Sequence, residues 1–100
     1  MKTNDLSFTT RHFGTVYVAT DLYHHGGKLA VELVDENSEL IATLSVNLPE
    51  SSRLLGAGEF FAKTWSENEE IAEEALASGI FRDTGRTSGE TLNARIWAFR

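Results

Sequence analysis

The sequence predicts an α+β fold: an antiparallel sheet of about four to six strands with one amphipathic helix, at about 66–78, packed on one face. Two observations predict this class. Strand-like segments alternate with polar loops of hairpin length, and one helical stripe of apolar residues follows them. The loops are shorter than the crossovers that parallel strands require, so the strands are expected to pair antiparallel. The chain has 100 residues, one proline and no repeat, which predicts a single domain over residues 1–100.

The first half of the chain predicts three strands after a loose start at 1–6. Their segments either are rich in Val, Thr and Tyr or alternate apolar with polar side chains: 13–23, 28–34 and 40–48. Turn residues separate them, with His-His-Gly-Gly at 24–27 and a polar loop at 35–38. Pro49 ends the third strand, because proline has no N–H to donate to the ladder.

The second half predicts a fourth strand, the helix, a short strand that leads into a turn, and a last strand: 59–65, 66–78, 80–82, 84–86 and 91–99. Ser66 and Glu69 match a capping box, in which the serine side chain accepts the Glu69 amide and the glutamate reaches back. Gly79 is expected to end the helix. Buried residues are expected on the apolar faces of the third strand and the helix: Leu40, Leu44, Val46, Leu48, Ile71 and Leu76.

Composition predicts a cytoplasmic protein. The chain has no cysteine, which excludes disulfides, thiolate zinc sites and thiol nucleophiles. No apolar segment of a signal peptide follows Met1, and no run approaches the ~20 residues that span a bilayer. The net charge is −6, and residues 1–79 hold 13 acidic and five basic side chains. Non-specific binding to nucleic acid is therefore not expected, and a basic protein is the better electrostatic match.

The candidates for catalysis are weak. His24 and His25 are adjacent and His12 is distant in sequence, without the spacing of converging metal ligands, so we expect surface histidines and neither metal nor cofactor. No Gly-x-Ser-x-Gly elbow is present, and the glycines at 56–58 are too few for a phosphate loop. The protein is therefore not expected to be an enzyme, and a small hydrolase or metal-dependent enzyme is the weaker alternative.

The predicted helix is the strongest candidate for a binding surface. It carries five glutamates without Lys or Arg three or four residues later to pair with them: Glu67, Glu69, Glu70, Glu73 and Glu74. Like charges four residues apart cost a few tenths of a kcal/mol per pair. We interpret this acidic face as the binding site for a basic partner. The alternative is a solvated face without a binding role.

Two tryptophans are the second candidate. Trp65 and Trp97 are expected on the strand face opposite the aliphatic stripe. If the helix leaves that face uncovered, the rings form an apolar patch suited to partner binding. The alternative is a second small core under the 50–58 loop.

Several blocks of the chain together resemble a family of uncharacterised small bacterial and phage proteins, a domain of unknown function that is frequent on mobile elements. These blocks lie within residues 28–87 and include Ala-Thr-Leu-Ser-Val-Asn-Leu-Pro at 42–49 and Trp-Ser-Glu-Asn-Glu at 65–69; the others are 32–36, 58–60, 77–80 and 83–86. The resemblance implies a mobile-element context, in which small acidic proteins often neutralise host defence. It assigns no functional residue.

The expected function is stoichiometric inhibition of a host defence system, as by an anti-CRISPR protein. The acidic helix would occupy a basic surface of a nucleic-acid-handling partner, such as a CRISPR effector complex or another defence nuclease. The alternative is a non-inhibitory accessory or regulatory protein of a mobile element.

Overall fold

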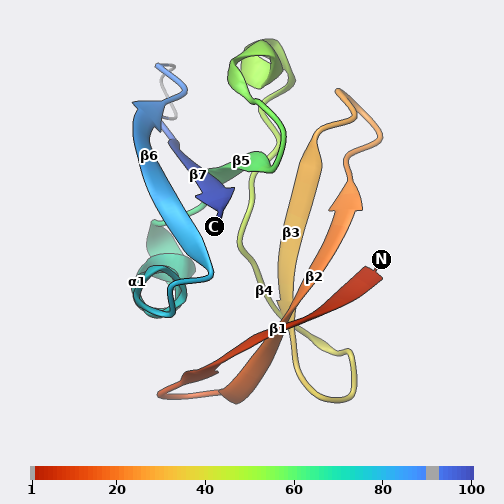
Figure 1. The fold of residues 1–100 in the computed structure, drawn as a ribbon, viewed down its shortest axis with the longest axis vertical. Coiled ribbons are helices and arrows are strands. Elements are labelled where there is room, and N and C mark those ends of the chain that lie inside the picture. The colour runs from red at the N-terminus through yellow and green to blue at the C-terminus, as the bar shows by residue number, and fades with distance from the viewer. Residues whose placement is uncertain (1, 90–92) are drawn as a thin grey trace.

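The computed structural model describes residues 2–89 and 93–100, with the side chains of 2–4 excluded. Seven strands lie in this part of the chain: β1 Lys2–Thr10, β2 Gly14–Leu22, β3 Leu29–Val34, β4 Leu40–Thr43, β5 Glu59–Ala62, β6 Phe81–Thr87 and β7 Arg95–Phe99. They form two antiparallel sheets, ordered β1–β2–β3–β4 and β5–β7–β6 (Figure 1). The predicted α+β class and antiparallel pairing are confirmed. The prediction had one sheet of about four to six strands, whereas the described strands form two sheets that pack on one core.

The helix lies where the sequence predicts it. A 3-10 turn, η2 Ser66–Asn68, leads into α1 Glu69–Ala77. Gly79 follows with φ of 83°, a left-handed conformation that glycine adopts without a steric cost. No helix in the described ranges is long and apolar enough to cross a membrane.

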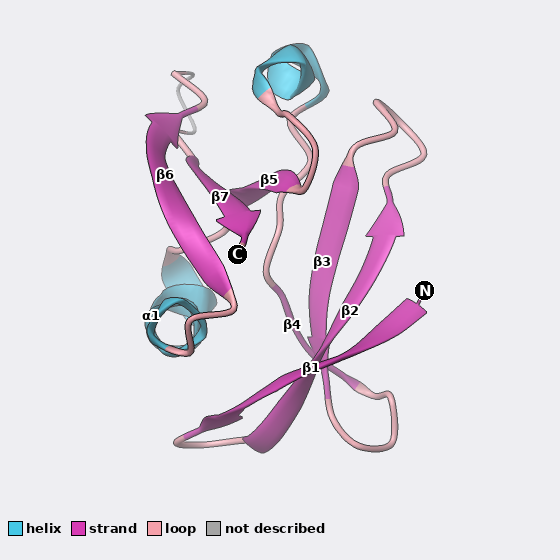
Figure 2. Cartoon of the chain, in the orientation of Figure 1, coloured by secondary structure: helices cyan, strands magenta, loops and turns pink. Residues whose placement is uncertain are grey.

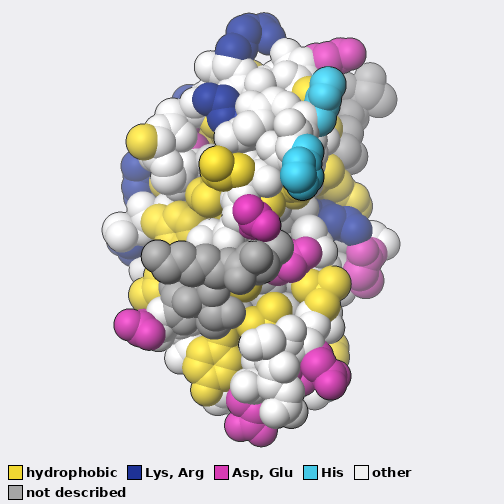
Figure 3. All heavy atoms as spheres, turned by 90° about the vertical axis from the view of Figure 1, so that its right-hand side faces the viewer, with side chains coloured by type: hydrophobic (Ala, Val, Ile, Leu, Met, Phe, Trp, Pro, Cys, Tyr) yellow, Lys and Arg dark blue, Asp and Glu magenta, His cyan; other side chains and the backbone are white. Residues whose placement is uncertain are grey.

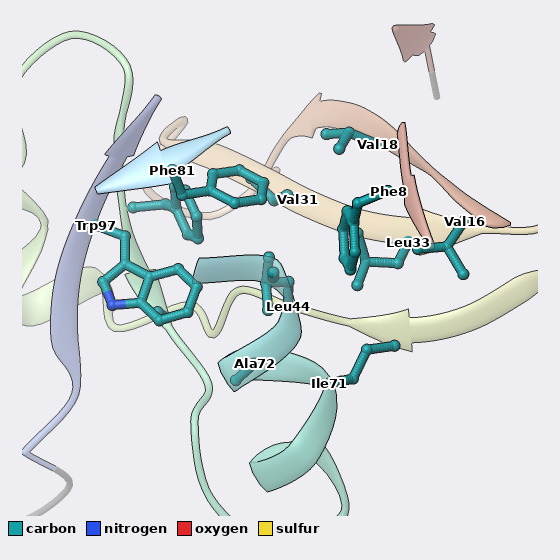
Figure 4. Packing of buried hydrophobic residues seen from close by; sticks show 13 residues of the cluster. Phe8, Val16, Val18, Val31, Leu33, Leu44, Ile71, Ala72, Phe81 and Trp97 are labelled. Atoms are coloured by element: carbon teal, nitrogen blue, oxygen red, sulfur yellow. The ribbon is translucent and has the colours of Figure 1, made fainter. Parts of the chain in front are cut away.

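The main core lies between the two sheets and α1 (Figure 4). Residues of β1 to β3 meet the aromatic rings of β5, β6 and β7 on one side and the helix on the other. Complete burial of a Val, Leu or Phe side chain stabilises the fold by about 1.5–3 kcal/mol. The cluster consists of Phe8, Val16, Val18, Val31, Leu33, Leu44, Phe60, Ala62, Ile71, Ala72, Ala75, Phe81 and Trp97.

A second, smaller core covers the other face of the three-stranded sheet. Phe61 and Ile96 point away from α1 and pack against the segment that contains the 3-10 helix η1 Pro49–Leu54, seen at the top of Figure 2. Its other members are Leu55 and Ala94, with Val46, Leu48, Leu54 and Trp65 packed around them. A small core under the 50–58 loop therefore exists, and Trp65 packs against it, whereas Trp97 belongs to the main core.

Two elements differ from the sequence prediction. The start of the chain is not loose over residues 2–6, which belong to β1: Lys2 and Thr3 pair with β2, and after a register shift the pairing resumes at Ser7. The predicted turn at 84–86 lies inside β6, where the pairing with β7 shifts between Asp83 and Thr87. Gly85 has φ of 84° there, so a bulge replaces the turn. Residues 91–92 of the predicted strand 91–99 lie outside the described residues, and β7 begins at Arg95.

Two leucines expected in the core are exposed instead. The register between β3 and β4 shifts between Leu33 and Val34, which leaves Ile41 as an extra residue and turns Leu40 away from the core. Leu40 is 58% exposed. Leu76 is 37% exposed because the buried stripe of α1 is centred on Ile71, Ala72 and Ala75. Leu44 and Ile71 are buried as predicted, and Val46 and Leu48 are half-buried.

Candidate functional site

The predicted capping box does not form. Ser66 has a left-handed φ of 58°, whereas an N-cap residue needs an extended backbone. The Glu69 N–H is accepted by the Ser66 main-chain carbonyl, and the Asn68 side chain makes no cap at α1. Asn68 is buried and donates from Nδ2 to the carbonyl oxygens of Thr43, at 2.7 Å, and Lys63, at 3.1 Å. These bonds attach the start of the helix to the end of β4.

Glu67 is paired within the chain. The Lys63 ammonium donates to its carboxylate, and the pair lies at the surface. This bond, followed by bonds from the Glu67 N–H and the Ser66 hydroxyl, lowers the pKa of Glu67 to about 2. Lys63 precedes Glu67 by four residues, whereas the predicted lack of partners concerned only cations that follow each glutamate.

Glu70 and Glu74 hold the turn between β1 and β2. The main-chain N–H of Arg11 donates to Glu74 Oε2 at 2.7 Å. Glu70 lies 2.9 Å from His12 Nε2 and 3.7 Å from the Arg11 guanidinium. Both carboxylates therefore attach a distant turn to α1, a contact between residues some 60 positions apart that no local pattern predicts.

Glu69 and Glu73 are the free carboxylates of the set. Both are exposed, and within the described residues neither has an ion pair or a side-chain hydrogen bond. They line a hollow of about 520 Å³ together with Glu70, Glu74, Arg11 and Ala77. The predicted acidic face exists, but only these two of its members lack a partner in the described part of the chain.

Two exposed apolar side chains lie next to this face, and the sequence analysis did not single them out. Phe13, in the β1–β2 turn, is 54% exposed, and Leu40 is 58% exposed. Both line a hollow of about 330 Å³ that reaches Lys63, Glu67 and Ile71. Phe13 also lines a second hollow beside Asp35 and Glu36. The signal for Phe13 in the sequence is its place directly before a turn glycine, between two strands.

We call this region the acidic end and define it as residues 11–13, 35–40 and 63–74. It lies where the β1–β2 turn, the β3–β4 loop and α1 approach one another, at the lower part of Figure 1. These described residues include eight acidic side chains and two basic ones, Arg11 and Lys63. The lower part of the face in Figure 3 shows Asp and Glu among hydrophobic side chains, without visible Lys or Arg.

The tryptophans do not form an exposed patch. Trp97 is 2% exposed, and its ring packs against Phe60 and Phe81 with centroid distances of 6.3 Å and 6.0 Å. The prediction of a surface position is wrong for Trp97, because both faces of the three-stranded sheet are covered. Trp65 is half-buried against the second core.

The three histidines do not converge. His24 and His25 are exposed in the β2–β3 turn, and His12 contacts Glu70. Among residues 2–89 and 93–100, no group of three or more His, Asp or Glu side chains has the arrangement of a metal site.

A different hollow lies away from the acidic end. It has a volume of about 590 Å³ and opens between the first sheet and the loop at 55–59. Leu6, Leu22 and Leu29 form one side, and Phe99 lies on the other. Leu22, 62% exposed, serves below as a control position for exposed apolar side chains.

Comparisons with family models, curated protein sequences and solved structures give no match for this chain. The resemblance to small mobile-element proteins therefore stays a prediction.

Proposed function

We propose that this protein binds a basic surface of a partner protein through its acidic end, and thereby inhibits a host defence complex that handles nucleic acid. The observation that carries the proposal is the pair of exposed, unpaired carboxylates at Glu69 and Glu73. They stand within a region of eight acidic side chains, and the two basic side chains of this region are already paired, Lys63 with Glu67 and Arg11 with Glu70. The negative charge of this region is therefore available to a partner.

Electrostatics gives the proposal its physical basis. Clustered charge of one sign raises the rate of encounter with a surface of the opposite sign, and salt screens that attraction with a Debye length of about 8–10 Å. Surfaces that bind nucleic acid carry Lys and Arg for phosphate contacts, so an acidic protein competes for the same side chains. Such competition needs binding alone and no catalytic group.

The test uses matched charge changes. Glu73→Lys and the double variant Glu69→Lys, Glu73→Lys reverse free carboxylates, and Glu50→Lys makes the same single change at an exposed position in η1. Glu70 and Glu74 stay unchanged because they hold the β1–β2 turn. The assay measures cleavage of target DNA by purified CRISPR effector complexes, and plating of phage on hosts that carry them.

The expected result is inhibition by the wild type and by Glu50→Lys, with a graded loss in the single and double variants. Circular dichroism must show unchanged secondary structure in all four proteins. Inhibition by the double variant at the wild-type level would show that the glutamates are only a solvated face. Absence of inhibition by the wild type against every complex tested would favour the accessory role over the inhibitory one.

A further inference from the structure

We propose that the hollow between Phe13 and Leu40 is the apolar anchor site of the acidic end, and that it receives a large apolar side chain from a basic segment of the partner protein. This inference rests on the proposed function, because it names the chemistry of the partner at the same surface. It goes further in assigning the short-range contact to two residues that carry no charge.

The turn that carries Phe13 is held in place without burying the phenyl ring. Thr10 Oγ1 accepts the Phe13 N–H at 2.9 Å and donates to the Gly14 carbonyl at 2.9 Å. From the other side, Glu74 accepts the Arg11 N–H and Glu70 contacts His12. The ring is nevertheless 54% exposed. Because the backbone of this turn is already fixed, little conformational entropy is lost when the exposed ring binds a partner. Aromatic side chains held in this way are typical anchors of protein interfaces.

Leu40 lines the same hollow as Phe13. The bulge at Ile41 turns Leu40 outward, so the apolar exposure results from the register of β3 and β4. Ile41 and Ile71 also line the hollow, and Ile71 belongs to the main core. An apolar side chain that enters the hollow therefore finds apolar groups from the β1–β2 turn, from β4 and from α1 in its lining.

Charge decides which partner fits. Asp35 and Glu36 line a hollow that Phe13 shares, and Glu67, which is paired with Lys63, lines the hollow of Phe13 and Leu40. The free carboxylates of Glu69 and Glu73 line the neighbouring hollow on α1. A second copy of this chain would bring a second acidic end against the first, and like charges repel. In a basic segment, Lys or Arg residues can pair with the acidic side chains around the hollow, and an apolar side chain between them can enter the hollow. We therefore assign the hollow to a basic partner segment.

The experiment uses two synthetic peptides of equal length and charge. One consists of Lys and Leu, and in the other each Leu is replaced by Ser. Isothermal titration calorimetry at low salt measures their binding to the wild-type protein, to Phe13→Ser and to Leu40→Ser. Leu22→Ser, which removes an exposed leucine outside the acidic end, is the control. The three replaced side chains are exposed, so each variant is expected to fold.

We expect the Lys/Leu peptide to bind the wild type more tightly than the Lys/Ser peptide. Phe13→Ser and Leu40→Ser should weaken binding of the Lys/Leu peptide by about tenfold or more, the size of a hot-spot loss, and Leu22→Ser should leave it unchanged. The Lys/Ser peptide should bind all four proteins equally.

Three outcomes contradict the inference. If both peptides bind equally and Phe13→Ser has no effect, the hollow is not an anchor site, but the acidic end can still attract a basic partner as the proposed function requires. If neither peptide binds, the acidic end does not attract basic segments, and the proposed function is contradicted as well. A wild-type dimer in sedimentation velocity that Phe13→Ser dissociates would assign the hollow to a second copy of the chain.

Discussion

Two leucines on the predicted apolar stripes, Leu44 and Leu76, have different surroundings in the folded chain. Leu44 is completely buried between the sheets, whereas Leu76 is 37% exposed at the rim of α1. A periodic pattern of apolar residues indicates which side chains face the interior. How completely each side chain is buried depends on the elements that pack against it. In α1 the buried residues are Ile71, Ala72 and Ala75, whereas Leu76 lines a hollow beside Trp97.

This difference predicts unequal losses of stability. Leu44→Ala should lower the free energy of unfolding by about 2–5 kcal/mol, because it leaves a cavity in a packed core. Leu76→Ala, with the same change of side chain, should cost well under half as much, because water already reaches the site. Urea unfolding followed by tryptophan fluorescence measures both. Equal losses would show that Leu76 is packed more tightly than its exposure indicates.

Glu67 gives a second prediction at the residue scale. Its pKa is lowered from 4.5 to about 2 by the bond from Lys63 and by the bonds from its own N–H and the Ser66 hydroxyl. A carboxylate with a lowered folded-state pKa stabilises the fold above its unfolded pKa, and the effect disappears as the pH falls through the folded value. The Glu67→Gln variant should therefore be less stable than the wild type at pH 6, and the difference should vanish between about pH 4.5 and 2.

The measurement is urea unfolding of both proteins at several pH values in that window. Glu36→Gln, in the exposed β3–β4 loop, makes the same change of net charge and is the control. A stability difference between Glu67→Gln and the wild type that does not depend on pH contradicts the assignment of the shift to this ion pair.

At the scale of the elements, local sequence patterns predict the helix and most of the strands. They fail where a strand or a bulge is defined by pairing with another segment of the chain. The helix at 66–78 follows from its stripe and from Gly79. The strand β1 does not, because its sequence is polar and only Phe8 and Thr10 are buried among its described side chains. Hydrogen bonds to β2 form this strand. The bulge at Ile41 is equally invisible in the sequence, since the alternation from Leu40 to Leu48 continues through it.

The candidate site, too, is predictable from the sequence only in part. The five glutamates were identifiable from their run on one predicted helix. Their roles were not, because the partners of Glu70 and Glu74 lie in the β1–β2 turn, and that contact exists only in the folded chain. The burial of Trp97 also needs the whole fold, since it depends on coverage of both faces of the second sheet.

The contact between α1 and the β1–β2 turn gives a prediction at this scale. Glu74→Gln weakens the bond to the Arg11 N–H, because a neutral amide oxygen is a weaker acceptor than a carboxylate. Hydrogen exchange of the Arg11 amide should therefore become faster, by about threefold to tenfold, for a loss of about 0.7–1.4 kcal/mol. Glu73→Gln, one residue earlier on the exposed side of the helix, should leave the rate unchanged.

NMR exchange rates at neutral pH provide the measurement. If Glu73→Gln accelerates the Arg11 amide as much as Glu74→Gln does, the effect comes from the charge of the helix rather than from the specific bond.

At the scale of the whole molecule, charge and apolar exposure coincide at one end. The acidic end joins three segments from different parts of the chain, and it contains both free glutamates and two of the exposed apolar side chains, Phe13 and Leu40. The hollow beside Leu6 and Leu22 is lined by Lys28 and by one glutamate, Glu59, which is paired with Arg86. We therefore expect a basic partner to bind at the acidic end rather than at this hollow.

A ¹⁵N NMR titration with the Lys/Leu peptide tests directly where a basic partner binds. The account predicts that amide shifts change at residues 11–13, 35–40 and 67–74, and that these changes weaken steeply as salt is raised. Residues around Leu6, Leu22 and Lys28 should keep their positions in the spectrum. Shift changes centred on those residues, or spread evenly over the surface, would contradict the assignment of the acidic end as the binding site.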